Sequence, residues 1–80
     1  MSDWIETETP FGSYVLNTLV KIGTIGSFNK ILLAVRSDAG RDIQECELRD
    51  ALEFLCNVDW LHHLKRSDTY LINESRLSLL

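Results

Sequence analysis

An acid-rich amphipathic helix that runs directly into a short apolar hairpin constrains the fold of this chain most strongly. Over residues 42–56 the apolar side chains recur at helical spacing, at Leu48, Ala51, Leu52 and Leu55. Two short apolar segments follow, 60–64 and 69–72, and they flank a polar turn at 65–68. The period therefore changes from helical to extended near Trp60, and the sequence predicts a helix followed by a two-stranded hairpin.

Two further helices are expected before this unit. The first runs from about Phe11 or Ser13 to Ile22, and Gly23 is placed to end it in a left-handed conformation. The second runs from Phe28 to about Ser37, with Ser27 as its N-cap and Ala39-Gly40 at its end. The apolar faces of these two helices are Val15, Leu16, Leu19, Val20 and Ile22, and then Phe28, Ile31, Leu32 and Val35.

The ends of the third helix also carry signals. Asp42 with Glu45 three residues later matches a capping box in which Asp replaces Ser or Thr. Asn57 tolerates the left-handed turn that must follow the helix. A chain of 80 residues forms one small domain. We therefore expect an α+β, mainly α fold over 11–80, with three helices and then a β-hairpin, preceded by a flexible arm over 1–10.

This order of elements resembles the winged-helix superfamily. The resemblance lies in residues 48–55, 57–61 and 68–72, and it covers about residues 27–73. Many members have a glycine in the turn that falls here at residues 57–59. Two registers remain open: the helices 11–22, 28–37 and 43–56 taken in order, or the second of these as the first helix of the family.

A shorter segment, Ala51 to Asn57, is similar to part of the protein-binding winged helix at the C-terminus of the replication protein A middle subunit. The superfamily resemblance implies either of two functions. Many winged helices bind DNA with the last helix in the major groove and the wing on the backbone. Others bind proteins.

The charge of the third helix argues against the DNA function. Its segment 42–57 holds one cation, Arg49, and five acids: Asp42, Glu45, Glu47, Asp50 and Glu53. The whole chain has a net charge of −4, and phosphates would repel such a surface. If the chain does bind DNA, the candidate contacts are Arg49 and the two cations of the predicted turn, Lys65 and Arg66. The acids Glu45, Asp50 and Glu53 are candidates for a protein-binding face.

The hairpin supplies further candidates for a protein interface. Alternation predicts that Trp60, His62 and Leu64 share one face, while Tyr70 and Ile72 oppose Leu71 on the second strand. Both faces then carry apolar groups, and the arm, the tail at Leu77–Leu80 or a partner has to cover the second one. Trp4 and Ile5 are additional candidate anchors.

Several classes of function are not expected. The neighbouring His62 and His63 would point to opposite faces of a strand, so they cannot bind one metal ion together. No phosphate-binding loop or nucleophile motif occurs, and we expect neither an enzyme nor a cofactor or small-molecule substrate. Cys46 and Cys56 are too far apart along a helix to form a disulfide. The longest apolar run has five residues, and we expect a soluble, cytoplasmic protein.

The sequence thus favours a small non-enzymatic regulatory module that acts through protein contacts. It would form a homodimer or dock on a larger assembly, as phage-type regulators and inhibitors do. The alternative is a sequence-specific DNA-binding transcriptional regulator that uses the hairpin and the third helix.

Overall fold

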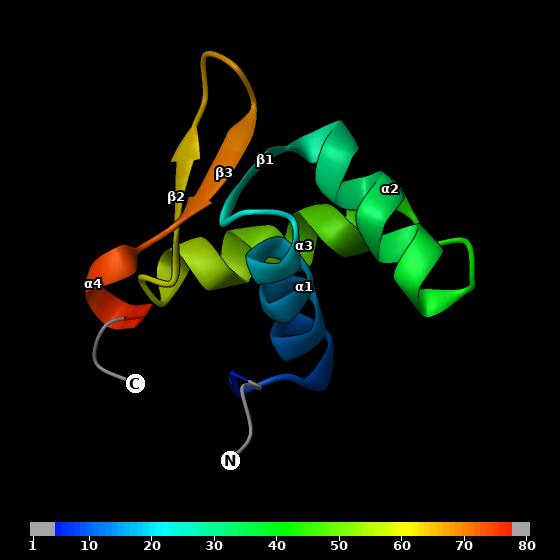
Figure 1. The fold of residues 1–80 in the computed structure, drawn as a ribbon, viewed down its shortest axis with the longest axis horizontal. Helices are drawn as coiled ribbons and strands as arrows, with labels where there is room; N and C mark the ends of the chain where they lie inside the picture. The colour runs from blue at the N-terminus through cyan, green and yellow to red at the C-terminus, as the bar shows by residue number, and fades with distance from the viewer. Residues whose placement is uncertain (1–4, 78–80) are drawn as a thin grey trace.

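The computed structural model describes residues 5–77, and residues 1–4 and 78–80 lie outside this part. Three helices precede the hairpin: α1 (Pro10–Lys21), α2 (Phe28–Ala39) and α3 (Glu45–Asn57). The strands are β1 (Ile25–Ser27), β2 (Leu61–Leu64) and β3 (Thr69–Ile72), and the single turn α4 (Glu74–Leu77) follows. Figure 1 shows the hairpin rising beside the helices, with α3 passing behind α1. The α+β, mainly helical fold with a hairpin after three helices agrees with the predicted class.

The sheet has one strand more than the sequence predicted. Its order is β1-β3-β2 and both pairings are antiparallel. β1 lies in the segment that we expected to be a plain connection between the first two helices. Hydrogen bonds outside the ladder hold both of its ends: Ile72 N–H donates to Thr24 O, and Phe28 N–H donates to Asp68 O, each at 2.9 Å. Three residues with a central glycine are too short to show alternation in the sequence.

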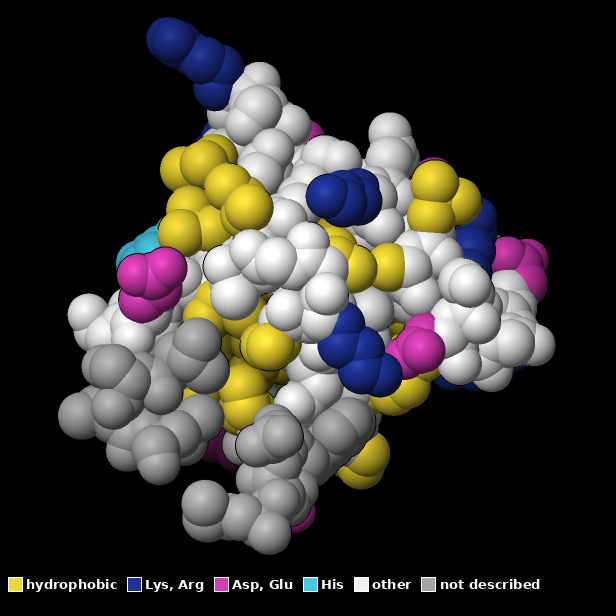
Figure 2. Space-filling model, in the orientation of Figure 1, with side chains coloured by type: hydrophobic (Ala, Val, Ile, Leu, Met, Phe, Trp, Pro, Cys, Tyr) yellow, Lys and Arg dark blue, Asp and Glu magenta, His cyan; other side chains and the backbone are white. Residues whose placement is uncertain are grey.

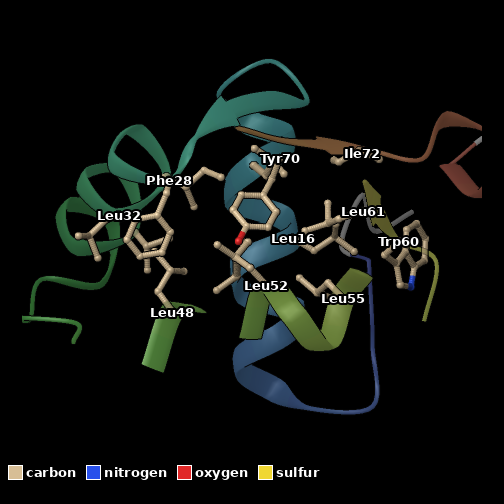
Figure 3. Close-up of a cluster of buried hydrophobic side chains, with 14 of the residues drawn as sticks. Leu16, Phe28, Leu32, Leu48, Leu52, Leu55, Trp60, Leu61, Tyr70 and Ile72 are labelled. Atoms are coloured by element: carbon tan, nitrogen blue, oxygen red, sulfur yellow. The ribbon is translucent and has the colours of Figure 1, made fainter. Parts of the chain in front are cut away.

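The helices and the inner face of the sheet share one core. Figure 3 shows side chains from α1, α2, α3 and the hairpin meeting in it, with Tyr70 and Ile72 of β3 above the leucines of α3. The predicted apolar positions Val15, Leu16, Leu19, Ile31, Val35, Leu48, Leu52 and Leu55 are all fully buried. The helical periodicity therefore identified these inward positions, while Val20, Ile22 and Ala51 of the predicted faces are only partly buried.

The ends of α2 follow the predicted signals. Ser27 is the N-cap, and its Oγ accepts a hydrogen bond from Lys30 N–H at 3.3 Å. Gly40 adopts the left-handed conformation (φ 68°) and its N–H donates to Arg36 O at 3.0 Å. A residue with a Cβ would be strained at that position.

Both predictions for the ends of α3 are wrong. The N-cap is Gln44, without a side-chain hydrogen bond, and no capping box forms. Asp42 instead pairs with Arg36 at 3.2 Å, and Arg36 Nε also donates to Ile43 O at 2.9 Å. At the other end Asn57 is still helical, and the left-handed residue is Asp59 (φ 65°). The ion pair to α2 thus competes successfully with a local cap.

The residues before α1 do not form a free arm where the structure describes them. Ile5 is only 5% exposed, and the Asn17 side chain binds both of its backbone groups: Oδ1 accepts from Ile5 N–H at 2.9 Å, and Nδ2 donates to Ile5 O at 2.8 Å. Thr7 N–H donates to Ser13 Oγ at 2.6 Å. Thr9 then caps α1, its Oγ1 accepting from Gly12 N–H at 3.0 Å. Residues 5–9 are therefore attached to α1.

We expect Asn17→Ala to lower the free energy of unfolding by about 2 kcal/mol, because it leaves the buried N–H and C=O of Ile5 without partners. Urea denaturation followed by circular dichroism measures this change. The matched control is Asn29→Ala, at an exposed position of α2, which should stay within about 0.5 kcal/mol of the wild type. Equal effects of the two substitutions would contradict the role assigned to Asn17.

In the stretch from residue 5 to residue 77, no helix is both long and apolar enough to cross a membrane.

Candidate functional site

Asp68, the last residue of the hairpin turn, joins three elements of the fold. Its carbonyl oxygen accepts the hydrogen bond from Phe28 N–H at the start of α2. Its carboxylate accepts from Arg49 of α3 and from His63 of β2. The residue has a left-handed backbone (φ 48°), which Asp tolerates better than most residues do. We call Asp68, Arg49, His63 and Tyr70 the Asp68 junction.

Arg49 makes the strongest contacts in this junction. Its Nη1 donates to Asp68 Oδ1 at 2.9 Å and its Nη2 donates to Asp68 Oδ2 at 3.2 Å, so the ion pair is bidentate. Nη1 also donates to the Tyr70 hydroxyl at 3.1 Å. The guanidinium lies over the Phe28 ring, 3.8 Å from its centroid. A Lys side chain cannot reproduce this geometry, because it has no planar group that can both form a bidentate pair with a carboxylate and stack on an aromatic ring.

His63 completes the junction from the inner face of β2. Its ring stacks on the Tyr70 ring with centroids 4.2 Å apart and an angle of 3° between the planes. The Nε2 atom lies 2.9 Å from Asp68 Oδ1. Because an ionised carboxylate can only accept, His63 Nε2 carries the hydrogen and donates it.

The junction shifts the ionisation of its members. The hydrogen bond from Arg49, and then the one from His63, hold the pKa of Asp68 below its ordinary value. The hydrogen bonds to Asp68 and Tyr70 raise the pKa of Arg49. Burial raises the pKa of the Tyr70 hydroxyl. At neutral pH Asp68 is therefore an anion, Arg49 a cation and Tyr70 a neutral donor and acceptor.

We expect Asp68→Asn to lower the free energy of unfolding at pH 7 by about 1 kcal/mol, because the pair is partly exposed to solvent. Asn keeps the left-handed backbone available. The folded pKa of Asp68 lies below the unfolded value, so its contribution is present above about pH 4 and is lost as the pH falls further. The difference between wild type and variant should shrink as the pH falls from about 5 towards 2, as denaturation at each pH measures.

Asp50→Asn is the control for this prediction, since Asp50 is an exposed acid of the same helix as Arg49. Its effect on the free energy of unfolding should be small at every pH. A difference between wild type and Asp68→Asn that does not change with pH would contradict the role of the Asp68 carboxylate.

The exposed side of α3 is acidic. Glu45, Asp50 and Glu53 are all exposed, and within residues 5–77 none of them forms an ion pair. The other two acids of the predicted set are partly neutralised, Asp42 by Arg36 at 3.2 Å and Glu47 by Arg41 at 3.5 Å. We call Glu45, Asp50 and Glu53 the α3 acidic face.

A groove of about 390 Å³ separates α3 from the hairpin, next to this face. It is lined by Arg49, Glu53, Cys56, Asn57, His63, Lys65 and Tyr70. Burial raises the pKa of the Cys56 thiol, so this thiol stays protonated and is a weak nucleophile. The groove therefore offers hydrogen-bonding groups and partly buried surface rather than a reactive group.

Two of the predicted interface anchors belong to the core instead. Trp60 and Ile5 are each only 5% exposed. Trp60 precedes β2 and follows the left-handed Asp59, so it does not continue the alternation of the strand. Arg76 lies over its ring, 4.4 Å from the centroid, and donates to Val58 O. The prediction that Trp60 shares a face with His62 and Leu64 is therefore wrong. Trp4 and the tail from Ser78 to Leu80 lie outside the described residues.

The other hairpin candidates remain at the surface. His62 and Leu64 are exposed, while Leu61, Tyr70 and Ile72 point into the core. Leu64 is 44% exposed and Ile25, on the neighbouring outer face of β1, is 48% exposed. Figure 2 shows hydrophobic side chains gathered on the hairpin below the Lys and Arg side chains at its tip. The sheet thus has one buried face and one partly apolar outer face.

The three candidate DNA contacts are not alike. Lys65 and Arg66 are exposed in the turn of the hairpin, without an ion pair to any other described residue. Arg49 is committed to Asp68. The sequence did not reveal this commitment, because the partners are 19 residues apart and no local spacing relates them. Within residues 5–77 no cluster of three His, Cys, Asp or Glu side chains has the geometry of a metal site.

Comparison of the chain with protein-family models, with curated proteins and with solved structures found no match.

Proposed function

We propose that this chain is a non-enzymatic regulatory module of the winged-helix type that binds a basic segment of a protein partner through the α3 acidic face. The order of elements supports the winged-helix assignment, since three helices lead through a tight turn at residues 58–60 into a hairpin. The order α1, α2 and α3 before the hairpin supports the first of the two registers that the sequence left open.

The observation that carries the proposal is the state of the charges on α3. Glu45, Asp50 and Glu53 form no ion pair with any described residue, while the one Arg of the helix is held by Asp68. A surface of this kind attracts Lys and Arg side chains and repels phosphates. A partner with cations at helical spacing could pair with several of these acids at once.

The groove between α3 and the hairpin supports the same proposal. Its lining comes from both elements, with Arg49, Glu53, Cys56 and Asn57 on α3 and His63, Lys65 and Tyr70 on the hairpin. A partner segment that lies along α3 would place apolar side chains in this groove and cations on the carboxylates beside it. The apolar contacts would bury surface in the interface, and the charge pairs would orient the partner.

DNA binding is the second candidate, and the hairpin tip favours it. Lys65 and Arg66 are two adjacent, exposed and unpaired cations at the place where a wing would touch the DNA backbone. Two phosphate contacts alone give weak, salt-sensitive binding. The acidic face of α3 would have to turn away from the DNA.

Fluorescence anisotropy with labelled 15-residue Lys/Leu peptides and a labelled 30-base-pair duplex distinguishes the two functions. The wild type should bind the peptides and not the duplex at about 50 mM salt. The Asp50→Lys, Glu53→Lys double variant should lose at least about tenfold in peptide affinity, because repulsion replaces two attractions. The matched control, Lys65→Glu with Arg66→Glu, should bind the peptides at least as tightly as the wild type does, because Lys65 lines the groove and its reversal adds an acid there.

The opposite pattern would favour the DNA function. The wild type would then retard the duplex, and Lys65→Glu with Arg66→Glu would abolish or weaken this binding. Any binding that remains should show a slope of log affinity against log salt concentration that is smaller by up to about 2. This result would replace the protein-binding proposal. Peptide binding that survives the double reversal on α3 would show that the acidic face is not the site.

A further inference from the structure

One edge of the sheet has no partner strand among the described residues. The strand order places β2 at one margin of the sheet, and no described element pairs with its outer side. Figure 1 shows β2 at the outer margin of the hairpin, away from α2. An edge strand exposes a row of N–H and C=O groups that can pair with a strand of another chain.

The sequence of β2 does little to prevent such pairing. It reads Leu61-His62-His63-Leu64, with no Lys, Pro or acidic residue, and its one-to-one register with β3 contains no bulge. Natural proteins commonly use these features to protect an exposed edge. The outer face beside this edge is also partly apolar. Leu64 lies at this edge, and Ile25 lies on the same face at the opposite margin, on β1; they are two of the three large hydrophobic residues exposed in the described chain.

Charges of opposite sign lie at the two ends of the hairpin. Lys65 and Arg66 follow β2 at the tip, while Asp59 precedes β2 and Glu74 follows β3 at the base, and all four are exposed. A second copy that runs antiparallel would bring its base beside the tip of the first. The cations at the tip of each copy would then lie beside the acids at the base of the other. Because of the two-fold symmetry, this contact would occur twice in the dimer.

We propose that a second copy of this chain pairs with β2 across a two-fold axis and extends the sheet to six strands. Residues directly opposite in an antiparallel pair must lie on the same face. Registers that meet this condition are centred on single residues, and the one centred on His62 brings Lys65, just beyond one end of β2, near Asp59, which lies before the other end of the partner strand. In that register the two His62 side chains face each other on the outer surface, and Leu61 opposes His63 on the inner one.

The other edge of the sheet is less suited to this role. β1 has only three residues, and α2 begins directly after it with Ser27 as the N-cap. Its residues also lack a pair of opposite charges at the two ends, since Thr24 precedes the strand and Phe28 follows it. The free edge of β2 therefore has both the length and the charge pattern for self-pairing.

This interface uses none of the three carboxylates of the α3 acidic face and does not rest on the proposed function, although His63 and Lys65 belong both to the edge of the hairpin and to the groove beside α3. A dimer formed through β2 carries two copies of Glu45, Asp50 and Glu53, one set on each α3. Binding of a basic partner and self-association can therefore be tested independently.

Light scattering of the 80-residue chain over a range of concentrations tests the dimer. The wild type should form dimers, and His62→Asp should weaken them at least about tenfold, because it places two like charges opposite each other on the axis. The matched control is Leu33→Asp, which removes the exposed hydrophobic residue of α2, 66% exposed, and should leave the dimer intact. A monomeric wild type at all concentrations, or a dimer that His62→Asp leaves unchanged, would overturn the proposal.

Cross-linking gives a second readout that does not depend on weakening the protein. In a background with Cys46→Ser and Cys56→Ser, His62→Cys should form a disulfide-linked dimer on mild oxidation. Paired Cα atoms in antiparallel strands lie about 4.5–5.5 Å apart, within the range of disulfides. Thr69→Cys, on the central strand β3, is the control and should remain monomeric. Equal cross-linking of the two variants would count against the β2 edge, and neither readout involves a basic peptide.

Discussion

The bidentate ion pair between Arg49 and Asp68 is the contact on which the arrangement of the hairpin depends. Asp68 ends the turn in a left-handed conformation, and the residue that follows it begins β3. Its carbonyl oxygen accepts a hydrogen bond from the N–H of Phe28, the first residue of α2. Its carboxylate binds α3 through Arg49. One residue therefore links the hairpin to α2 and to α3. A hairpin with four-residue strands would be marginally stable without such support.

The same ion pair changes the chemistry of α3. Arg49 is the single cation among the five acids between Asp42 and Asn57, and its charge is used inside the molecule. Arg36 and Arg41 neutralise Asp42 and Glu47 from outside the helix. What remains free on α3 is three carboxylates, and these give the helix its character as a surface. Internal electrostatics thus decide which charges are left for a partner.

Periodicity predicted those parts of the fold that depend on neighbours in the sequence. The inward residues of the three helices and the hairpin turn follow from local spacing, and the structure confirms them. Contacts between distant residues left no such signal: Asn17 holds Ile5 twelve residues away, and β1 forms only because β3 pairs with it. Trp60 was assigned to the wrong face because the left-handed Asp59 sets the start of β2 one residue later. The α3 acidic face was predictable, and the commitment of Arg49 was not.

A core of this size covers only one side of a three-stranded sheet. Tyr70, Ile72 and Leu61 fill the inner side, so Ile25 and Leu64 remain on the outer side, and Leu64 lies at the edge of β2, with which no described strand pairs. The acidic face belongs to α3, which packs against β2 and reaches the hairpin turn through Arg49. The two surfaces are therefore built on different elements but are held in a fixed relation by the Asp68 junction. A partner bound to α3 would have a defined orientation relative to the sheet edge, because the hairpin shares its core with α3 and Asp68 holds Arg49.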